Sequence, residues 1–303
     1  LKPDNCQIYF QSKNQDVKDL AFLLGKKVNW SQMTATYGFS GKTNMTHVFS
    51  PLIQTGDILH VQLSKFGGIR PVLVPVGVDQ DPHIRLSRDI AKAHRLYNVT
   101  KTKDGKIGVF VKPDDQVGAL LDNAERILLS NDFDSLKRIT DYKAIYVKDA
   151  TEQQIGYIDH LLAYSEPEFD GYGFLPPAAT FHRFMTGLTG EKMSSSKPES
   201  AIFLTDTPSE AKKKIMHAKT GGAVSLEQQK QDGGNPDDCM IYELFLYHLT
   251  DDDEELKEIY TTCRQGERMC GHCKKQAAER MGLILEDIAE KREHAEEIIE
   301  EYL

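Results

Sequence analysis

Residues 69–91 read IRPVLVPVGVDQDPHIRLSRDIA, and this stretch decides the fold class. Its first ten residues are rich in β-branched side chains and lie between Gly67-Gly68 and Asp79, which predicts a buried parallel strand ending in a ligand-facing loop. A helix is expected to follow over about 82–96. A strand joined to a helix in this way is the unit of a doubly wound α/β sheet, which binds ligands at the carboxyl ends of its strands. We therefore expect an α/β fold with a binding site directly after the strand.

The loop after this strand carries polar side chains at the expected site. Asp79 and Gln80 come first, and Asp81-Pro82 begins the next helix. A glutamine amide both donates and accepts hydrogen bonds, which suits the ammonium group of an amino acid and its neighbours. The alternative is local, because Asp79 or Asp81 could instead cap the amino end of the helix. The residues alone leave both interpretations open.

A second informative stretch covers residues 190–206, GEKMSSSKPESAIFLTD. Lys192 supplies a point charge, and short hydroxyl donors follow it at Ser194, Ser195 and Ser196. A lysine followed by small hydroxyl residues, in a loop before a helix, suits a mobile clamp on phosphates. Taken alone, the same loop is equally compatible with a solvated turn.

The composition limits the class of protein. The chain has 303 residues, of which 40% are hydrophobic and 27% charged, so it is long enough for two globular domains with a sizeable core. No apolar run approaches the roughly 18 residues that span a membrane, and the start does not resemble a signal peptide. We therefore expect a cytoplasmic protein without a membrane segment. The net charge of −9 argues against non-specific polyanion binding by the whole surface, but not against a local basic face.

Four of the five cysteines lie close together in the sequence. Cys239, Cys263, Cys270 and Cys273 have the spacing C-x23-C-x6-C-x2-C, and Cys6 stands outside the set. Two thiolates separated by two residues can bind one metal, and two more complete a tetrahedral set. Zinc and an iron–sulfur cluster are both compatible with four thiolates. The alternative is four unrelated small core residues, because free cysteine is often buried.

Residues 98–172 differ in character from the segment before them. Lys103-Asp104-Gly105-Lys106 predicts a hairpin turn, residues 107–111 predict a strand, and helical periodicity covers 115–130 and 151–164. We interpret this segment as an insertion or variable subdomain within a first domain over residues 1–206.

After residue 206 the pattern is almost entirely helical. Thr207-Pro208-Ser209-Glu210 is typical of a helix start, with a hydroxyl cap, a proline and then an acid. Residues 207–303 are therefore expected to form an all-α second domain. Its helices are predicted at about 208–218, 238–249, 252–264, 270–280 and 282–302.

These motifs together resemble a known family. The loop at 190–206 resembles the KMSKS signature of class I aminoacyl-tRNA synthetases, and its continuation SAIFLTD is similar to the tryptophanyl and tyrosyl branch. The segment PVGVDQDPHIRLSRDIA and the glycines Gly221-Gly222 and Gly233-Gly234 look like the tryptophanyl members. The resemblance implies a Rossmann-like catalytic domain followed by a helical anticodon-binding domain. It also implies activation of L-tryptophan by ATP through tryptophanyl-adenylate, with release of pyrophosphate, and transfer to tRNA(Trp).

The resemblance assigns roles to residues of the amino-acid pocket. Gln80, beside Asp79, would hold the α-amino group, and Gln32 would be a second contact to that group. Asp57 lies in a segment that resembles a pocket helix, where an aspartate bonds the polar atom of the substrate side chain. A carboxylate acceptor suits either an indole N–H or a phenol, so Asp57 does not separate tryptophan from tyrosine. Without the resemblance, Asp57 could equally pair with a nearby base or face solvent.

The resemblance also assigns the ATP site. Lys192 would neutralise the leaving pyrophosphate, Met193 belongs to the same ATP-binding segment, and Ser194 and Ser196 would donate hydrogen bonds. Ser195 stands where the family usually has a second lysine, and Lys197 is a candidate substitute. Magnesium would accompany ATP through its phosphates.

The helical domain would bind the tRNA anticodon. A local basic patch flanks the cysteines and consists of Arg264, Arg268, Lys274 and Lys275. Some tryptophanyl members carry a 4Fe–4S cluster on nearly this cysteine pattern, so the resemblance favours that cluster, with Zn²⁺ second. Each basic residue could instead belong to a solvated helix face. Family members are homodimers, and the resemblance implies a homodimer here.

One motif of the family does not occur. No HIGH-like motif, whose histidines line the phosphates of ATP, lies between Leu1 and the loop at 190–206. Since the chain also begins at Leu1 rather than Met, we expect it to be the C-terminal part of a synthetase with an N-terminally incomplete catalytic domain. The alternatives are a tyrosyl synthetase, a non-catalytic metal-containing RNA-binding protein of synthetase descent, and a redox role for the four cysteines.

Overall fold

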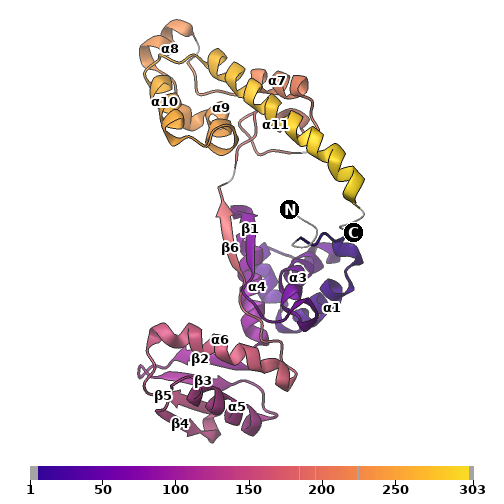
Figure 1. The fold of residues 1–303 in the computed structure, drawn as a ribbon, viewed down its shortest axis with the longest axis vertical. Helices are drawn as coiled ribbons and strands as arrows, with labels where there is room; N and C mark the ends of the chain where they lie inside the picture. Colours follow the sequence, from indigo (N-terminus) through magenta and orange to yellow (C-terminus); the bar gives the residue numbers. More distant parts are fainter. Residues whose placement is uncertain (1–5, 184, 195, 224, 300–303) are drawn as a thin grey trace. The chain divides into compact units, whose positions relative to one another are not determined.

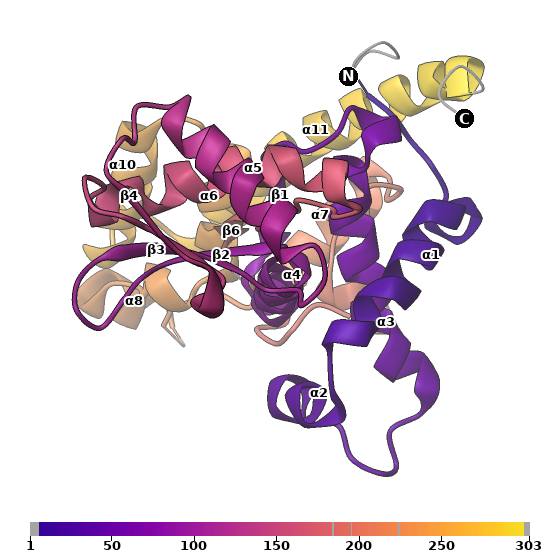
Figure 2. The ribbon, with the colours of Figure 1, turned by 90° about the horizontal axis from the view of Figure 1, so that it is seen from below.

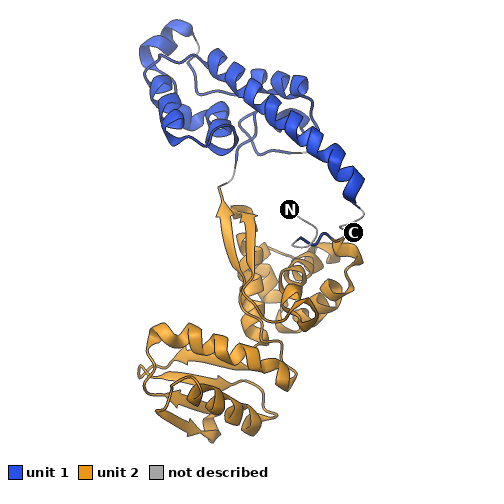
Figure 3. Cartoon of the chain, viewed as in Figure 1, with its two compact units in different colours: residues 1–8, 184–303 blue, residues 9–183 orange. Residues whose placement is uncertain are grey.

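The computed structural model describes residues 6–183, 185–194, 196–223 and 225–299. The chain divides into two compact units, shown in Figure 3: unit 1 comprises residues 1–8 and 184–303, and unit 2 comprises residues 9–183. Residues 185–194 and 196–206, which we assigned to a catalytic domain, thus cluster with the helical part. Their functional assignment stays a prediction, and each unit is described by itself.

The first part of unit 2 places helices beside a parallel strand pair (Figure 1). Strands β1 and β6 pair in parallel, with Leu73 opposite Ala178 and Gly77 opposite His182. Leu24, Leu59 and Ile84 are fully buried in the core beneath them. The bounds are α1 Gln15–Leu24, α2 Trp30–Tyr37, α3 Met45–Leu59, β1 Leu73–Gly77, α4 Asp81–His94 and β6 Ala178–His182.

The strand–helix unit that decided the fold class is confirmed, with one correction. The predicted strand and helix appear as β1 and α4, joined by a short 3₁₀ turn over Val78–Gln80. The strand is not the buried core strand that we expected, because Leu73 is 62% exposed. Among the described residues β1 pairs with β6 alone, so part of its surface lies uncovered.

The second part of unit 2 is a four-stranded antiparallel sheet with two helices. The strand order is β2-β3-β5-β4. The predicted strand at 107–111 and both predicted helices are confirmed, and Gly105 forms the hairpin turn with a φ of +83°. The bounds are β2 Tyr97–Lys101, β3 Ile107–Val111, α5 Val117–Leu129, β4 Leu136–Ile139, β5 Ala144–Val147 and α6 Ile155–Ser165.

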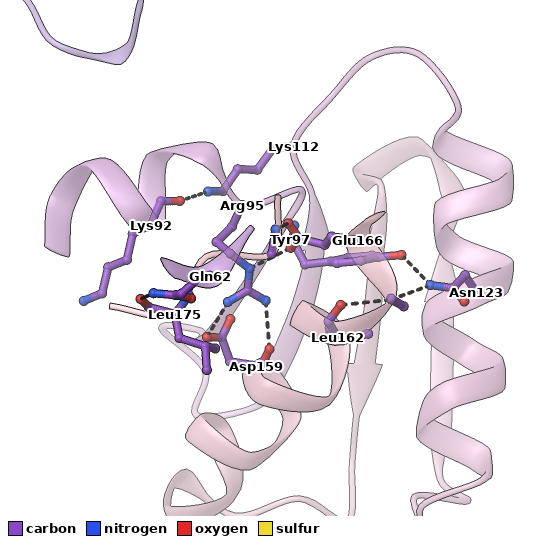
Figure 4. Close-up of polar contacts among 12 residues, drawn as sticks. Gln62, Lys92, Arg95, Tyr97, Lys112, Asn123, Asp159, Leu162, Glu166 and Leu175 are labelled. Carbon is purple, nitrogen blue, oxygen red and sulfur yellow. Dashed lines mark hydrogen bonds and ion pairs between the residues drawn. The ribbon is translucent and has the colours of Figure 1, made fainter. Parts of the chain in front are cut away.

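A buried polar network joins this sheet to the end of α4 (Figure 4). The guanidinium of Arg95 donates through Nε to Glu166 Oε1 at 2.7 Å and through Nη1 to Asp159 at 2.8 Å. Both Arg95 and Glu166 are almost completely buried. Glu166 also accepts from the backbone N–H of Gly173 at 3.1 Å. Beside it, Gln62 exchanges two hydrogen bonds of 2.9 Å with the backbone of Leu175.

Unit 1 is a helical bundle in which α7 packs along α11. The predicted break near residue 281 is wrong, because α11 continues without interruption. Gly282 stays helical since its neighbours Met281 and Leu285 are buried in the core shared with α7. The bounds are α7 Pro208–His217, α8 Leu226–Asp232, α9 Met240–Leu244, a π-helical turn Phe245–Leu249, α10 Asp253–Arg264 and α11 Cys270–Ile298. Within the described part of the chain, no helix is long and apolar enough to cross a membrane.

Candidate functional site

Polar side chains gather beside α3 of unit 2. Asp57 accepts a hydrogen bond from the hydroxyl of Tyr9 at 2.5 Å and another from Gln11 Nε2 at 2.8 Å. One turn earlier on the helix, Gln54 donates to Gln80 Oε1 at 3.1 Å. Gln80 Nε2 in turn lies 3.4 Å from Asp79 Oδ2. One region therefore contains three predicted pocket residues, Asp57, Gln80 and Asp79. Gln54 joins the helix of Asp57 to Gln80.

An open hollow adjoins these groups. It has a volume of about 730 Å³, and its lining includes Gln11, Phe49, Ile53, Gln54 and Asp57. The aromatic and aliphatic side chains give it an apolar wall, while the amides and the carboxylate give it a polar edge. A hollow with these two features can hold a flat apolar ring that carries one N–H or O–H donor.

The loop at the end of β1 does not cap the following helix. Helix α4 begins without a side-chain cap, and Asp81 forms an ion pair with Arg85 at 2.5 Å instead. The carboxylate of Asp79 lies over Gly77, where a Cβ atom would be 2.7 Å from Asp79 Oδ1. The helix-cap alternative is therefore wrong, and Asp79 stays available at the carboxyl end of the strand.

Gln32 has a different set of contacts from the other predicted pocket residues. Its backbone N–H donates to Asn29 Oδ1, and its side-chain Oε1 accepts from Asn29 N, both at 3.0 Å. These two bonds form a capping box at the start of α2. The described contacts of Gln32 thus belong to its own helix, and its role in amino-acid binding stays a prediction.

Two of the residues beside the pocket have shifted pKa values. Burial, with the hydrogen bond to Asp57, raises the pKa of Tyr9, so the phenol stays a proton donor to the carboxylate. Burial lowers the pKa of His83, although Asp79 opposes this effect. His83 Nδ1 lies 3.0 Å from the hydroxyl of Tyr37. The phenol of Tyr9 and the imidazole of His83 are therefore neutral near pH 7.

The predicted phosphate loop lies in unit 1. The hydroxyls of Ser194 and Ser196 are 2.8 Å apart, and Ser194 N donates to Ser200 Oγ at 3.0 Å. Lys192 is exposed. Met193 is 39% exposed and lines an apolar cavity of about 350 Å³ in the same unit. Ser195 lies outside the described residues.

Lys197, the candidate substitute for the second lysine, is engaged by an acid. Its Nζ lies 2.9 Å from Glu191 Oε2. The hydrogen bond and charge of Glu191 raise the pKa of Lys197, and those of Lys197 lower the pKa of Glu191. Since both side chains are exposed, phosphate can compete with Glu191 for the ammonium group.

The four predicted cysteine ligands converge in unit 1 from three helices. Cys239 precedes α9, Cys263 lies on α10, and Cys270 and Cys273 lie in the first turn of α11. Burial first, and then the nearby thiols of the other three cysteines, raise the pKa of Cys263 to about 11. As the side chains stand, no group of three or more His, Cys, Asp or Glu in the described residues is arranged to hold a metal ion.

Three further features surround the cysteines. Gly222 and Gly234 lie against them, because a Cβ atom would be 2.4 Å from Cys270 Sγ at Gly222 and 2.8 Å from Cys263 Sγ at Gly234. Gln229 is 3% exposed, and its Nε2 has no hydrogen-bond partner. That amide nitrogen would also lie 2.8 Å from a Cβ atom at Gly234. An unpaired buried donor therefore lies next to the thiols.

The predicted basic patch divides into two kinds of side chain. Arg268 Nε donates to Cys273 Sγ at 2.9 Å, and Lys274 donates to the carbonyl of Met216 at 3.0 Å. Arg264 and Lys275 are exposed. Arg268 therefore acts on a thiol rather than on solvent, while Arg264 and Lys275 remain accessible to a polyanion.

A comparison with known families decides the class of the chain. The family model described as class I tRNA synthetases (W and Y) matches residues 1–124 and 135–286. The chain belongs to the class I tRNA synthetases for tryptophan and tyrosine. The match includes most of residues 98–172.

Curated relatives and solved structures agree with this family. A tryptophan–tRNA ligase of Methanosarcina acetivorans is 48% identical over all of this chain and 68% of its own length, and one of Thermoplasma acidophilum is 43% identical over 98% and 69%. The crystal structure of tryptophanyl-tRNA synthetase from Aeropyrum pernix K1 superposes with a TM-score of 0.67 at 33% identity. The match covers 98% of this synthetase chain and 60% of that one. A tyrosyl-tRNA synthetase structure from Aeropyrum pernix, with a TM-score of 0.52 at 16% identity, shares the fold.

Sequence reasoning missed four residues near the predicted sites. Gln54 lies three residues before Asp57 on α3, and this i, i+3 spacing could have identified it. Tyr9 and Gln11 reach Asp57 from 48 and 46 residues away, so no local pattern points to them. Gln229 is also separated by helices from the cysteines that it adjoins.

Proposed function

We propose that this synthetase activates L-tryptophan with ATP and transfers it to tRNA(Trp). The observation that carries the proposal is the match along the whole chain to archaeal tryptophan–tRNA ligases at 40–48% identity. The chain spans 58–69% of the curated relatives that it matches at this identity.

The pocket beside α3 supports a division of labour in tryptophan binding. Asp57 would accept the indole N–H, with Tyr9 and Gln11 holding its carboxylate in place through the bonds of 2.5 and 2.8 Å. Gln80, positioned by Gln54, would offer its amide oxygen to the α-ammonium group. Asp79 would add negative charge on the same side, which favours that ammonium group.

The loop around Lys192 would act on ATP. In the reaction, the carboxylate of tryptophan attacks the α-phosphorus, and the bond to pyrophosphate breaks as the adenylate forms. Negative charge then grows on the leaving group, so positioned donors accelerate the step mainly through charge stabilisation. Lys192 would supply the charge, and Ser194 and Ser196 would donate hydrogen bonds. Magnesium would bind through the phosphates rather than through a protein cage.

Pyrophosphate exchange tests this proposal. Exchange between ATP and pyrophosphate is measured with the native gene product, purified without air, in the presence of tryptophan or tyrosine. Exchange with tryptophan alone supports the proposal, and exchange with tyrosine alone contradicts tryptophan as the substrate. Without exchange for either amino acid, the non-catalytic RNA-binding alternative is favoured.

Two lysine variants separate the roles within the loop. Lys192→Ala is expected to lower the exchange rate by about 100-fold, because one charged donor to the transition state contributes roughly 3 kcal/mol. Lys197→Ala is the matched control and is expected to lower it less, since Glu191 already holds that ammonium group. Equal losses in both variants would contradict the leading role of Lys192.

We further propose that the four cysteines hold a 4Fe–4S cluster, with Zn²⁺ as the alternative. The support is the convergence of four thiols, the N–H of Arg268 on Cys273 Sγ and the unpaired amide of Gln229 beside them. The group would tie three helices together and shape the surface near Arg264 and Lys275, which would contact the anticodon. Iron, sulfide and zinc analysis of anaerobically purified protein distinguishes the two. A homodimer and a cytoplasmic location stay predictions from the resemblance.

A further inference from the structure

The antiparallel sheet of unit 2 has one covered face and one open face. Helices α5 and α6 lie on the same side of the sheet, as Figures 1 and 2 show. Alternate strand residues such as Val109, Ile145 and Val147 are fully buried against these helices. Because successive side chains of a strand point to opposite faces, the residues between them form the other surface.

Two aromatic rings lie at the centre of the open face. Phe110 is on β3 and Tyr146 is on β5, which are the two inner strands. Their ring centroids are 6.0 Å apart at an interplanar angle of 84°, and both rings are partly exposed. Tyr146 pairs with Gly108, and a Cβ atom at Gly108 would be 2.6 Å from the ring of Phe110. The glycine therefore lets the phenyl ring lie along the sheet.

The charged side chains of this face are lysines, and one of them, Lys106, forms an ion pair with Asp104 of the hairpin turn. Lys137 is on the open face of β4, opposite Tyr146, while Lys106 and Lys148 continue the same alternation one residue beyond β3 and β5. None of the open-face positions within the four strands is Asp or Glu. Residues 97–170 as a whole contain fourteen acids and nine Lys and Arg, and those acids lie on helices, loops and turns.

We propose that the open face of this sheet binds RNA, with unstacked bases against Phe110 and Tyr146 and phosphates against Lys106, Lys137 and Lys148. Sheets with central aromatic rings and flanking cations bind single-stranded RNA through stacking and phosphate contacts. A basic aromatic face on a protein with a net charge of −9 favours a polyanion over an acidic protein surface. The inference rests on the proposed function, which supplies tRNA as the ligand.

The test is the affinity of the full protein for tRNA(Trp) transcript, measured by fluorescence anisotropy at several salt concentrations. Lys137→Gln combined with Lys148→Gln changes two exposed side chains. It is expected to weaken binding and to reduce the salt slope by about 0.7 for each lost phosphate contact. Tyr146→Leu is expected to weaken binding by roughly tenfold with an unchanged slope, because stacking carries no charge.

The control variant lies on the same sheet but faces the other way. Lys101→Gln changes a lysine on β2 that pairs with Glu152 on the helix side, at 2.7 Å, and it should bind tRNA like the wild type. If all variants bind tRNA like the wild type, or if the control loses as much affinity as the other variants, the RNA-binding face is wrong while the proposed function still stands. A wild-type protein that binds no tRNA overturns the proposed function together with the inference. Thermal unfolding of each variant identifies a loss that comes from misfolding.

Discussion

Two buried polar clusters of this synthetase differ in how completely their hydrogen bonds are satisfied. In unit 2, the three guanidinium nitrogens of Arg95 donate to Glu166, to the carboxylate of Asp159 and to its backbone carbonyl, at 2.7–2.8 Å. In unit 1, the pKa of Cys263 and of Cys273 is raised by burial and by the neighbouring thiols. There the amide Nε2 of Gln229 has no partner.

The difference indicates what each cluster is for. A buried polar network that is fully satisfied needs nothing more, and it holds its elements in one arrangement. A buried donor without an acceptor costs free energy, so its presence beside four thiols points to an additional group that would accept its hydrogen bond. The Arg95 cluster is therefore structural, and the cysteine cluster is the candidate ligand site.

The largest expected effect comes from breaking the satisfied cluster. Arg95→Met leaves Glu166 buried without its counter-ion, and removing one partner of a buried pair costs on the order of 3–5 kcal/mol. Urea unfolding followed by circular dichroism measures the free energy of unfolding. The control is Arg138→Met, because Arg138 pairs with Asp122 and Glu125 near the surface, where ion pairs contribute roughly 0–1 kcal/mol. A similar loss of unfolding free energy in both variants would contradict a special structural role for the Arg95 cluster.

The pH dependence of Arg95→Met tests the same charge. Burial raises the pKa of Glu166, and the charge and hydrogen bond of Arg95 oppose that rise. Without Arg95, the folded-state pKa moves further above the unfolded value of about 4.3. The variant should therefore lose most stability at neutral pH and recover it as the pH falls through the folded pKa. A deficit that does not change with pH would show that lost packing, rather than charge, causes the cost.

A smaller effect is expected from the cysteine cluster. Cys263→Ser removes one of four thiols, and we expect a severalfold loss of bound iron or zinc together with a lower unfolding temperature. Cys6→Ser is the control, since Cys6 lies outside the set, and it should retain the wild-type metal content. If metal analysis finds no difference between the variants, the four thiols are core residues and the proposed cluster is wrong.

The sequence predicted local elements of both units and the grouping of the four cysteines, but not the polar network around Arg95. The strand at 107–111 and the helix after Gln80 follow from alternation, β-branched residues and a proline at the helix start, which are all local signals. The partners of Arg95 lie 64 and 71 residues further along the chain, so no spacing could reveal them. The cysteines were found because a CxxC pair is itself local. The exposure of β1 could not be read from its apolar composition, since it depends on which strands lie beside it.

The smallest effect should come from replacing Gln229. This replacement tests most directly whether the unpaired amide beside the thiols marks a metal site. Gln229→Leu removes the unpaired N–H, which favours folding, and also the oxygen that accepts from Ala223 N at 2.7 Å, which opposes folding. Because these two effects offset each other, the free energy of unfolding of the metal-free protein should change little. In the protein with a bound iron–sulfur cluster, the same change removes a hydrogen-bond donor to sulfur. A hydrogen bond of about 1 kcal/mol to the reduced cluster corresponds to roughly 40 mV for one electron, so the reduction potential should fall by that amount.

Gln228→Leu provides a neighbour of the same type for this measurement. Gln228 lies on the same helix, but its side chain is exposed, so its replacement should leave the potential at the wild-type value. Should the protein hold zinc, the rate of zinc loss to a chelator replaces the potential as the measured quantity. If both variants behave like the wild type, the amide of Gln229 is an unsatisfied donor with no acceptor in any state. The contrast with the Arg95 cluster would then reflect packing rather than ligand binding. An unpaired donor indicates a metal site only if the bound metal group accepts its hydrogen bond.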